Sequence, residues 1–270
     1  MRARAIVLAA TAALGLGALG GCTSAPVTGR NQLIMTSEAE EAQMGVEAFQ
    51  EVTAGSRLST NAAWTQMVQN SGRRIAAVAN RPDFQWEFRL IAEDTVNAFC
   101  LPGGKVAFYE GIMPVCRDEA GVAVVMGHEV GHAIARHGGE RVTQTMIAQN
   151  GVAIIAEIIS GKSPELARAA APALGAGVQV GALLPFSRKH ESEADEIGLF
   201  LMADAGYDPR EAPRFWERMV QATGGERSWE FLSTHPDPQN RIKRLNELMP
   251  EAMTHYEAAR AGKPPPTRKR

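Results

Sequence analysis

Two histidines and a glutamate stand together near the middle of the chain, in the order His128-Glu129-Val130-Gly131-His132. Residues four apart on a helix project from one face, so both imidazoles can reach one metal ion at the roughly 2.0–2.1 Å that zinc requires. Glu129 would lie to the side of that face, where its carboxylate can take a proton from an attacking water without binding the metal. This HExxH pattern on a helix predicts a zinc site suited to hydrolysis.

A catalytic zinc needs a third protein ligand, and the candidates lie further along the chain. Glu191 and Asp195 stand four residues apart in a predicted helix, whereas Glu193 is directed to about the opposite side. We expect Glu191 to bind the metal and Asp195 to hold a metal-binding histidine through its other ring nitrogen. His190 is a competing ligand, but it would face elsewhere, towards the surface.

His235 and Arg241 complete the predicted catalytic set. Both side chains can donate hydrogen bonds to the negative charge that develops on the scissile carbonyl during attack. Glu129 would act first as general base and then deliver its proton to the departing amine. His137, at the end of the HExxH helix, is expected instead to compensate the helix dipole.

The strand that begins at Gly104 is predicted to be an exposed sheet edge, to which an extended peptide adds through main-chain hydrogen bonds. The expected substrate-binding residues are Gly104, Lys105, Val106, Ala107 and Phe108. Such recognition reads backbone rather than sequence, which suits unfolded polypeptide substrates. The alternative is an ordinary paired strand.

The hydrophobic pattern predicts a mostly helical chain with a small sheet. Alternating apolar residues predict a strand at 84–91, and a second strand at 105–109 follows a turn at 97–102. Caps, periodicity and breaks predict helices at 37–55, 61–79, 118–137, 142–159, 164–181, 189–205, 209–222 and 238–248. We therefore expect an α+β fold in which the small sheet lies beside the HExxH helix.

The composition indicates one globular domain without an affinity for nucleic acid. The chain has 270 residues, of which 45% are hydrophobic and 21% charged, and its formal net charge is −2. That length suits a single core, and that charge offers nucleic acid no attraction. We expect an extended arm at 22–36, one packed domain at 37–260 and a disordered tail at 261–270. Charged residues interrupt the apolar stretch 151–184, which predicts buried or amphipathic helices rather than a membrane span.

Residues 1–21 have the positive start and short apolar run of an export signal. The run ends in Leu19–Cys22, which resembles the lipobox of bacterial lipoproteins, so we expect cleavage before Cys22 and lipidation of that cysteine. Thr23 stands where an aspartate would favour the inner membrane of enterobacteria. By that resemblance we expect a lipid anchor on the periplasmic side of a Gram-negative-type envelope, in the outer membrane. The alternative is a plain signal peptide.

Cys100 and Cys116 are the other two cysteines. In an oxidising compartment they could form a disulfide that contributes roughly 3 kcal/mol to stability. The alternative is two buried thiols. The absence of any CxxC spacing argues against a cysteine metal site.

Several motifs together resemble the zinc metallopeptidase family of HtpX, BepA and LoiP, which also contains the CAAX prenyl proteases and the mitochondrial OMA peptidases. They are the HExxH helix, the ExxxD helix of Glu191 and Asp195, the segment Asn97–Gly104, and His235-Pro236 followed by Arg241. The segment Pro26–Leu33 also resembles the exported bacterial members. The resemblance covers nearly all of the chain after the signal, although Cys100 stands where the family usually has a small or aliphatic residue.

The resemblance implies a zincin-like fold and a metalloendopeptidase of the gluzincin type with one zinc ion per chain. It supports Glu191 over Glu193 as the third ligand and implies quality control of misfolded cell-envelope proteins. In BepA-like members, the counterpart of His235 can instead occupy the fourth zinc position and silence the enzyme, so both roles of His235 stay open. The alternative function is a self-inhibited, chaperone-like zinc-binding lipoprotein with little proteolysis.

Overall fold

The computed structural model describes residues 22–145, 147–148, 187–222, 230–235 and 238–268. Residues 38–138 and 183–270 belong to one compact unit, and residues 1–37 and 139–182 to another. The predicted signal 1–21, the helix at 164–181 and most of the one at 142–159 lie outside the described residues. Within the described part, no helix is both long and apolar enough to cross a membrane.

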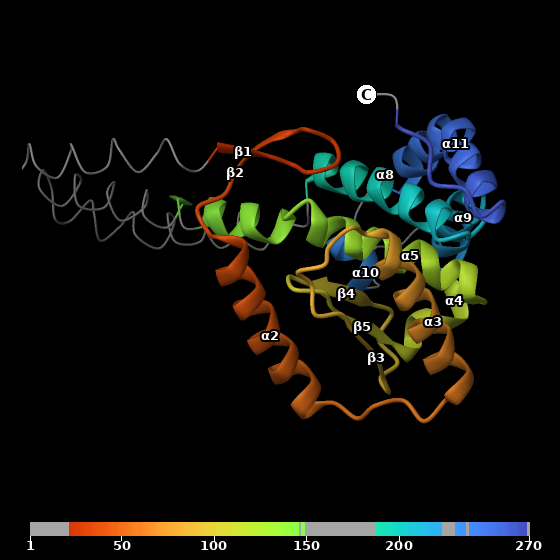
Figure 1. The fold of residues 1–270 in the computed structure, drawn as a ribbon. Coiled ribbons are helices and arrows are strands. Elements are labelled where there is room, and N and C mark those ends of the chain that lie inside the picture. Colours follow the sequence, from red (N-terminus) through yellow and green to blue (C-terminus); the bar gives the residue numbers. More distant parts are fainter. Residues whose placement is uncertain (1–21, 146, 149–186, 223–229, 236–237, 269–270) are drawn as a thin grey trace, which may run out of the picture. The chain divides into compact units, whose positions relative to one another are not determined.

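The first unit contains the small sheet and, of the predicted helices, all except those at 142–159 and 164–181 (Figure 1). Its helices are α2 (Glu38–Gly55), α3 (Ala62–Val78), α4 (Met113–Cys116), α5 (Glu119–Ile134), α8 (Arg188–Asp204), α9 (Glu211–Ala222), α10 (Glu230–Thr234) and α11 (Pro238–Arg260). Its strands are β3 (Glu87–Ile91), β4 (Ala98–Leu101) and β5 (Lys105–Tyr109), and a 3-10 turn, η1 (Glu110–Ile112), precedes α4. The expectation of a mostly helical α+β fold is confirmed.

Two helices that position the predicted site begin at capping side chains. Asp118 caps α5 by accepting a hydrogen bond from Gly121 N–H at 3.0 Å. Ser187 caps α8 by accepting one from His190 N–H at 3.2 Å. Such local signals are readable in the sequence, which is why these starts were predicted closely.

Helix α5 lies at the centre of this unit. Every residue from Gly121 to Ile134 is buried, including the polar His128, Glu129 and His132. A helix that is apolar on all sides belongs in a core, and the polar groups that it carries there need partners.

Helices α5 and α8 cross at small residues. A Cβ atom on Gly127 would lie 2.7 Å from the carbonyl oxygen of Gly198, and one on Gly131 would lie 2.8 Å from that of Ala194. Real Cβ atoms do not approach backbone so closely, so only glycine allows this contact. The close crossing brings the histidines of α5 within reach of the acids of α8.

The sheet has the order β3-β5-β4. Strand β5 is parallel to β3 and antiparallel to β4, so both of its sides are paired. The prediction that Gly104–Phe108 forms an exposed edge is therefore wrong. The two edge strands are β3, whose outer side is bonded to residues 57–59, and β4, which lies in the predicted turn 97–102. Gly103 and Gly104 both have φ of +83°, and their left-handed turn reverses the chain so that β4 folds back on β5.

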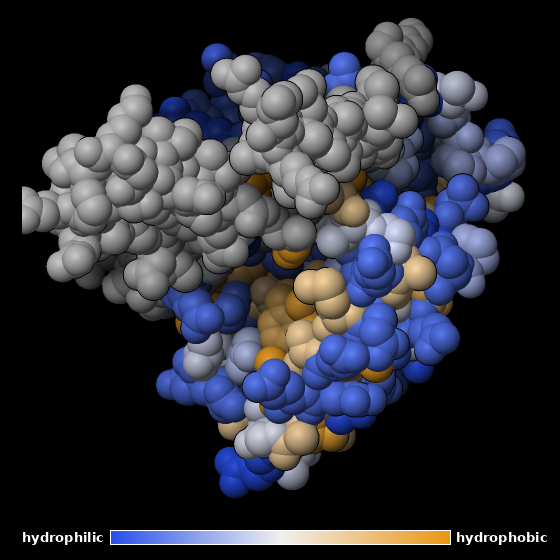
Figure 2. Space-filling view, turned by 90° about the vertical axis from the view of Figure 1, so that its left-hand side faces the viewer, coloured by the Kyte–Doolittle hydropathy of each residue, from blue (hydrophilic) through white to orange (hydrophobic). Residues whose placement is uncertain are grey.

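An apolar cluster lies on one face of the sheet. Its buried members are Phe49, Ile91 and Ala107, against which Val52, Phe99, Leu101 and Tyr109 pack while partly buried. Figure 2 shows hydrophobic residues gathered at the centre of one face of the protein, between hydrophilic borders. Edge strand β4 thus contributes apolar side chains that solvent can reach.

Helix α11 is longer than predicted. It continues through Pro250 to Arg260 instead of ending near 248. Ala252 and His255, beyond the proline, are buried, and this packing outweighs the hydrogen bond that Pro250 cannot make. In the tail, 263–268 form neither helix nor strand, although Arg268 pairs with Glu196.

The second unit contains a hairpin in place of the extended arm predicted at 22–36. Strands β1 (Cys22–Ser24) and β2 (Asn31–Leu33) pair antiparallel. Arg30 donates to both carboxylate oxygens of Glu140, at 3.2 and 2.8 Å. Within this unit the hairpin is therefore tied to the helical segment that contains Glu140.

Candidate metal centre

Four side chains converge on one point in the first unit. They are His128 and His132 of α5, Glu191 of α8, and His235, which follows α10. All four are buried, and one ligand atom from each lies within 4.8 Å of the others. The structure thus brings together the three predicted ligands and adds the residue whose role the sequence left open.

The spacing of the ligand atoms fits a tetrahedral zinc site. Nε2 of His128 lies 3.1 Å from Nε2 of His132. Glu191 offers Oε1 at 3.3 Å from His132 Nε2 and Oε2 at 3.5 Å from His128 Nε2. Bonds of about 2.0–2.1 Å in a tetrahedron place ligand atoms about 3.3–3.4 Å apart, close to these distances.

The protonation of these groups also suits a cation. Burial lowers the pKa of His128 to about 4 and holds that of His132 well below its usual range, so both rings are neutral at pH 7. Burial alone would raise the pKa of Glu191, but the charges of Arg241 and His235 outweigh it and hold the pKa well below the usual value. The site therefore presents two neutral imidazoles and one carboxylate, a known zinc donor set.

His235 lies at the remaining corner of this group. Its Nδ1 is 3.1 Å from Nε2 of His128 and 3.0 Å from Oε1 of Glu191. These separations are those of a fourth ligand atom. On its other side, Nε2 of His235 lies 3.5 Å from Oε1 of Glu129.

Glu129 lies beside the ligands without belonging to them. The backbone of Cys100, on β4, lies beside its carboxylate and favours the charged form. Its Oε1 is buried and has no hydrogen-bond partner among the described residues. Burial raises the pKa of Glu129 to about 7, and the charge of Glu191 adds to the rise. A carboxyl group with this pKa can both accept and release a proton near neutral pH.

Asp195 and Arg241 lie behind the ligands. Oδ1 of Asp195 is 3.0 Å from Nδ1 of His128, so the metal-site histidine that Asp195 was predicted to hold is His128. Arg241 donates to both oxygens of Asp195 at 2.6 Å, and its Nη1 lies 2.9 Å from Oε2 of Glu191. Its guanidinium lies over the Trp216 ring, 3.6 Å from the centroid. These contacts favour a role in holding the two acids rather than the predicted role of oxyanion donor.

Three residues that the sequence placed outside the site belong next to it. Glu193, His137 and His190 are buried, although the last two were predicted at a helix end and on the surface. His137 contacts both Glu193 and the metal-site histidine His132, and it stacks on His190 with 4.4 Å between ring centroids. A turn that redirects the chain after α5 produces this grouping, and helical periodicity does not predict it.

Of the two alternatives for Cys100 and Cys116, a disulfide or two thiols, the structure has free thiols. Cys116 is buried at the end of α4, whereas Cys100 lies on β4 with its Sγ 3.6 Å from the Leu101 carbonyl oxygen. Burial raises the pKa of both thiols, so both stay protonated at neutral pH.

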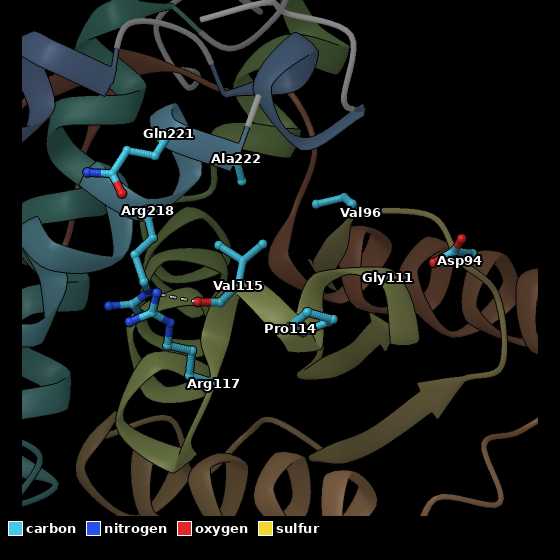
Figure 3. Close-up of a pocket in the computed structure, with 9 residues that line it drawn as sticks. All are labelled: Asp94, Val96, Gly111, Pro114, Val115, Arg117, Arg218, Gln221 and Ala222. Carbon is cyan, nitrogen blue, oxygen red and sulfur yellow. Dashed lines mark hydrogen bonds between the residues drawn. The ribbon is translucent and has the colours of Figure 1, made fainter. Parts of the chain in front are cut away.

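A separate cavity of about 600 Å³ lies beside the loop that precedes β4 (Figure 3). It is lined by Asp94, Val96, Gly111, Pro114, Val115, Arg117, Arg218, Gln221 and Ala222. Arg218 donates to the Val115 carbonyl oxygen at 3.0 Å and pairs with Glu211. None of the metal-centre residues lines this cavity.

Comparison with known proteins matches most of the chain to one family. The pattern of Peptidase family M48 matches residues 62–249. Mitochondrial metalloendopeptidase OMA1 of Schizosaccharomyces pombe is 38% identical over 238 residues, which are 87% of this chain and 68% of that protein. Mitochondrial metalloendopeptidase OMA1 of Saccharomyces cerevisiae is 30% identical over 266 residues, 88% and 74% of the two chains.

A bacterial relative is also similar. The beta-barrel assembly-enhancing protease of Escherichia coli is 30% identical over 222 residues, which are 79% of this chain but only 45% of that protein. The relatives thus include mitochondrial and bacterial peptidases, as the motifs suggested. With its zinc-type donor set and its matched region, this chain belongs to Peptidase family M48, a family of zinc-dependent metallopeptidases.

Proposed function

We propose that this metallopeptidase is an endopeptidase that cuts unfolded or misfolded proteins of the cell envelope. One observation carries the proposal: a buried group of zinc ligands lies beside the edge strand β4, with Glu129 between them. A metal, a base and a strand edge in contact are what hydrolysis of an extended peptide requires.

His128, His132 and Glu191 would hold the zinc ion. When bound, zinc supplies a Lewis acid that polarises a carbonyl oxygen and makes water acidic enough to lose a proton near pH 7. The contact of Asp195 with His128 Nδ1 fixes the proton on that nitrogen, so Nε2 offers its lone pair to the metal. Arg241 holds Asp195 and Glu191 in place through charge-assisted hydrogen bonds.

Glu129 would move the proton. Its buried Oε1 faces the ligand group without a hydrogen-bond partner among the described residues, so it can accept a proton from the attacking water. With a pKa raised to about 7, the same group can then give that proton to the departing amine.

The substrate would add to β4 rather than to β5. Asn97 accepts from the Tyr109 N–H, so by the alternation of an antiparallel ladder the main-chain groups of Cys100 point away from β5, on the side of Glu129. A peptide pairing there brings its main chain to Glu129 whatever its sequence. The partly exposed Phe99 and Leu101 offer apolar contacts to unfolded segments.

We infer that His235 holds the site closed in this arrangement. Its Nδ1 occupies the corner where water or a carbonyl oxygen would approach the metal. The same observation supports the second candidate function, a self-inhibited, chaperone-like zinc protein with little proteolysis. The two differ in whether substrate displaces His235.

A digestion assay tests the function and separates these candidates. We expect the zinc-loaded chain to cut unfolded casein, to lose activity when a chelator removes zinc, and to recover it on re-addition. His235→Ala opens the fourth corner and should raise the rate, about tenfold if closure is favoured by about 1.4 kcal/mol. Cleavage that continues after the chelator has removed zinc would contradict the zinc endopeptidase. Zinc binding without cleavage, in both the wild type and His235→Ala, would favour the chaperone-like protein.

We also propose that a lipid on Cys22 anchors the chain on the periplasmic side of the outer membrane. The signal-like segment 1–21 and the likeness to a bacterial beta-barrel assembly-enhancing protease support this location. In a Gram-negative host, Cys22→Ala should move the protein from the membrane pellet to the soluble fraction and remove the lipid mass from the intact protein. Cys116→Ala, at a buried thiol, is the matched control. An unlipidated wild type would contradict the anchor.

A further inference from the structure

The ring of His132 meets a second buried histidine on the side opposite to the ligand group. Nδ1 of His132 lies 2.8 Å from Nδ1 of His137. Nε2 of His137 in turn lies 3.0 Å from Oε2 of Glu193. His137 is 0% exposed and Glu193 6%. His132, His137 and Glu193 therefore form a buried chain of hydrogen bonds that ends at a carboxylate.

The chemistry of these groups gives the chain a direction. For Nε2 of His132 to offer a lone pair to the metal, the ring proton must be on Nδ1. That N–H then donates to Nδ1 of His137, whose own proton must be on Nε2. The Nε2–H of His137 donates to the carboxylate of Glu193, which completes a consistent set of donors and acceptors.

The backbone between the two histidines supports a selected arrangement. Arg136 has φ of +58°, in the left-handed region that is uncommon for residues other than glycine. This turn ends α5 and returns His137 to the ring of His132. The Arg136 guanidinium is itself held by buried Glu41 through hydrogen bonds of 3.1 and 2.8 Å. A sparsely populated conformation with its own anchor is typical of functional positions.

The two histidine ligands thus have separate supports. Asp195 contacts His128 directly, whereas Glu193 contacts His132 through His137. Asp195 and Glu193 both belong to α8, the helix that also carries the proposed ligand Glu191. We propose that His137 and Glu193 are positioning residues that fix the tautomer and orientation of His132. This inference rests on the role of His132 as a zinc ligand proposed above.

Zinc affinity of the full chain, measured by competition with a chromophoric chelator, tests the proposal independently of activity. His137→Phe keeps the ring volume but removes the acceptor, and we expect the zinc Kd to rise about 10–100-fold. His137→Gln can accept from His132 through its amide oxygen and donate to Glu193, so it should restore most of the affinity. Glu193→Gln, of the same shape, should give an intermediate loss.

The matched control is His255→Phe in the same unit. His255 is also buried and also pairs with a carboxylate, because its Nδ1 lies 2.7 Å from Oδ1 of Asp204, but it contacts no zinc ligand. We expect this variant to lower thermal stability and leave the zinc Kd unchanged.

The outcomes separate this inference from the zinc site itself. A wild type that binds no zinc would overturn the proposed site. If the wild type binds zinc, two results would overturn the positioning role alone. One is a folded His137→Phe variant with the wild-type zinc Kd. The other is a His255→Phe variant that raises the zinc Kd as much as His137→Phe does. Should His137→Phe not fold, Glu193→Gln and ¹⁵N NMR of the histidines decide, with His132 expected to carry its proton on Nδ1 in the wild type and an Nε2 proton contradicting the proposal.

Discussion

Replacing Glu129 by glutamine will abolish peptide cleavage while zinc content stays near one ion per chain. The amide has the shape of the carboxyl group but cannot accept a proton. Since Glu129 is not one of the proposed ligands and an amide fills the same space beside the Cys100 backbone, the ligands and β4 should remain in place. Loss of a general acid–base of this kind lowers kcat by about 10²–10⁴-fold.

The measurement is the rate of casein digestion beside metal analysis of the same sample. Glu119→Gln is the matched control, because Glu119 lies in the first turn of the same helix and bonds Tyr207 instead of the site. Its digestion rate should be that of the wild type. Cleavage by Glu129→Gln at the wild-type rate would falsify the proton-transfer role.

Glu191→Ala is expected to remove most of the bound zinc. The change leaves two imidazoles as ligands and also deprives Arg241 of a carboxylate at 2.9 Å, so the positive guanidinium then repels a cation. Loss of a group that supports a ligand lowers metal affinity by about 10–100-fold. We expect loss of the ligand Glu191 itself to lower the zinc affinity by more than that.

Glu193→Ala is the comparison for this ligand assignment. Its zinc content should stay near stoichiometric when zinc is in excess, even though the affinity falls through the loss of support for His132. Metal analysis at saturating zinc and after dialysis distinguishes the two variants. A reverse result, with zinc retained in Glu191→Ala and lost in Glu193→Ala, would transfer the ligand role to Glu193.

Features that depend on neighbouring residues were predicted well. Helices α5 and α8 begin directly after their capping residues Asp118 and Ser187, close to the predicted starts. That Asp195 supports a metal-site histidine also followed from the sequence, because the spacing of Glu191 and Asp195 places both on one face of one helix; the structure shows that this histidine is His128.

Features that depend on pairing between distant segments were not predicted from the sequence. The sequence indicated that 105–109 is a strand, but a strand pattern does not say whether one side or both sides are paired. For the same reason, the segment 97–102 was predicted to be a turn and forms edge strand β4. The sequence also left open whether Cys100 and Cys116 pair, since spacing along the chain does not give the distance between two cysteines.

The amino-acid sequence by itself determined the reactive groups: two imidazoles and a base on one helix, and an acid pair on another. Helix geometry relates residues four apart in any surroundings, so this part needs no tertiary information. Only the tertiary structure decided that His235 lies at the fourth corner, that Glu193 reaches His132 through His137, and that β4, not β5, is an edge strand beside the site. These depend on how segments far apart in the chain pack together, which spacing along the chain does not specify.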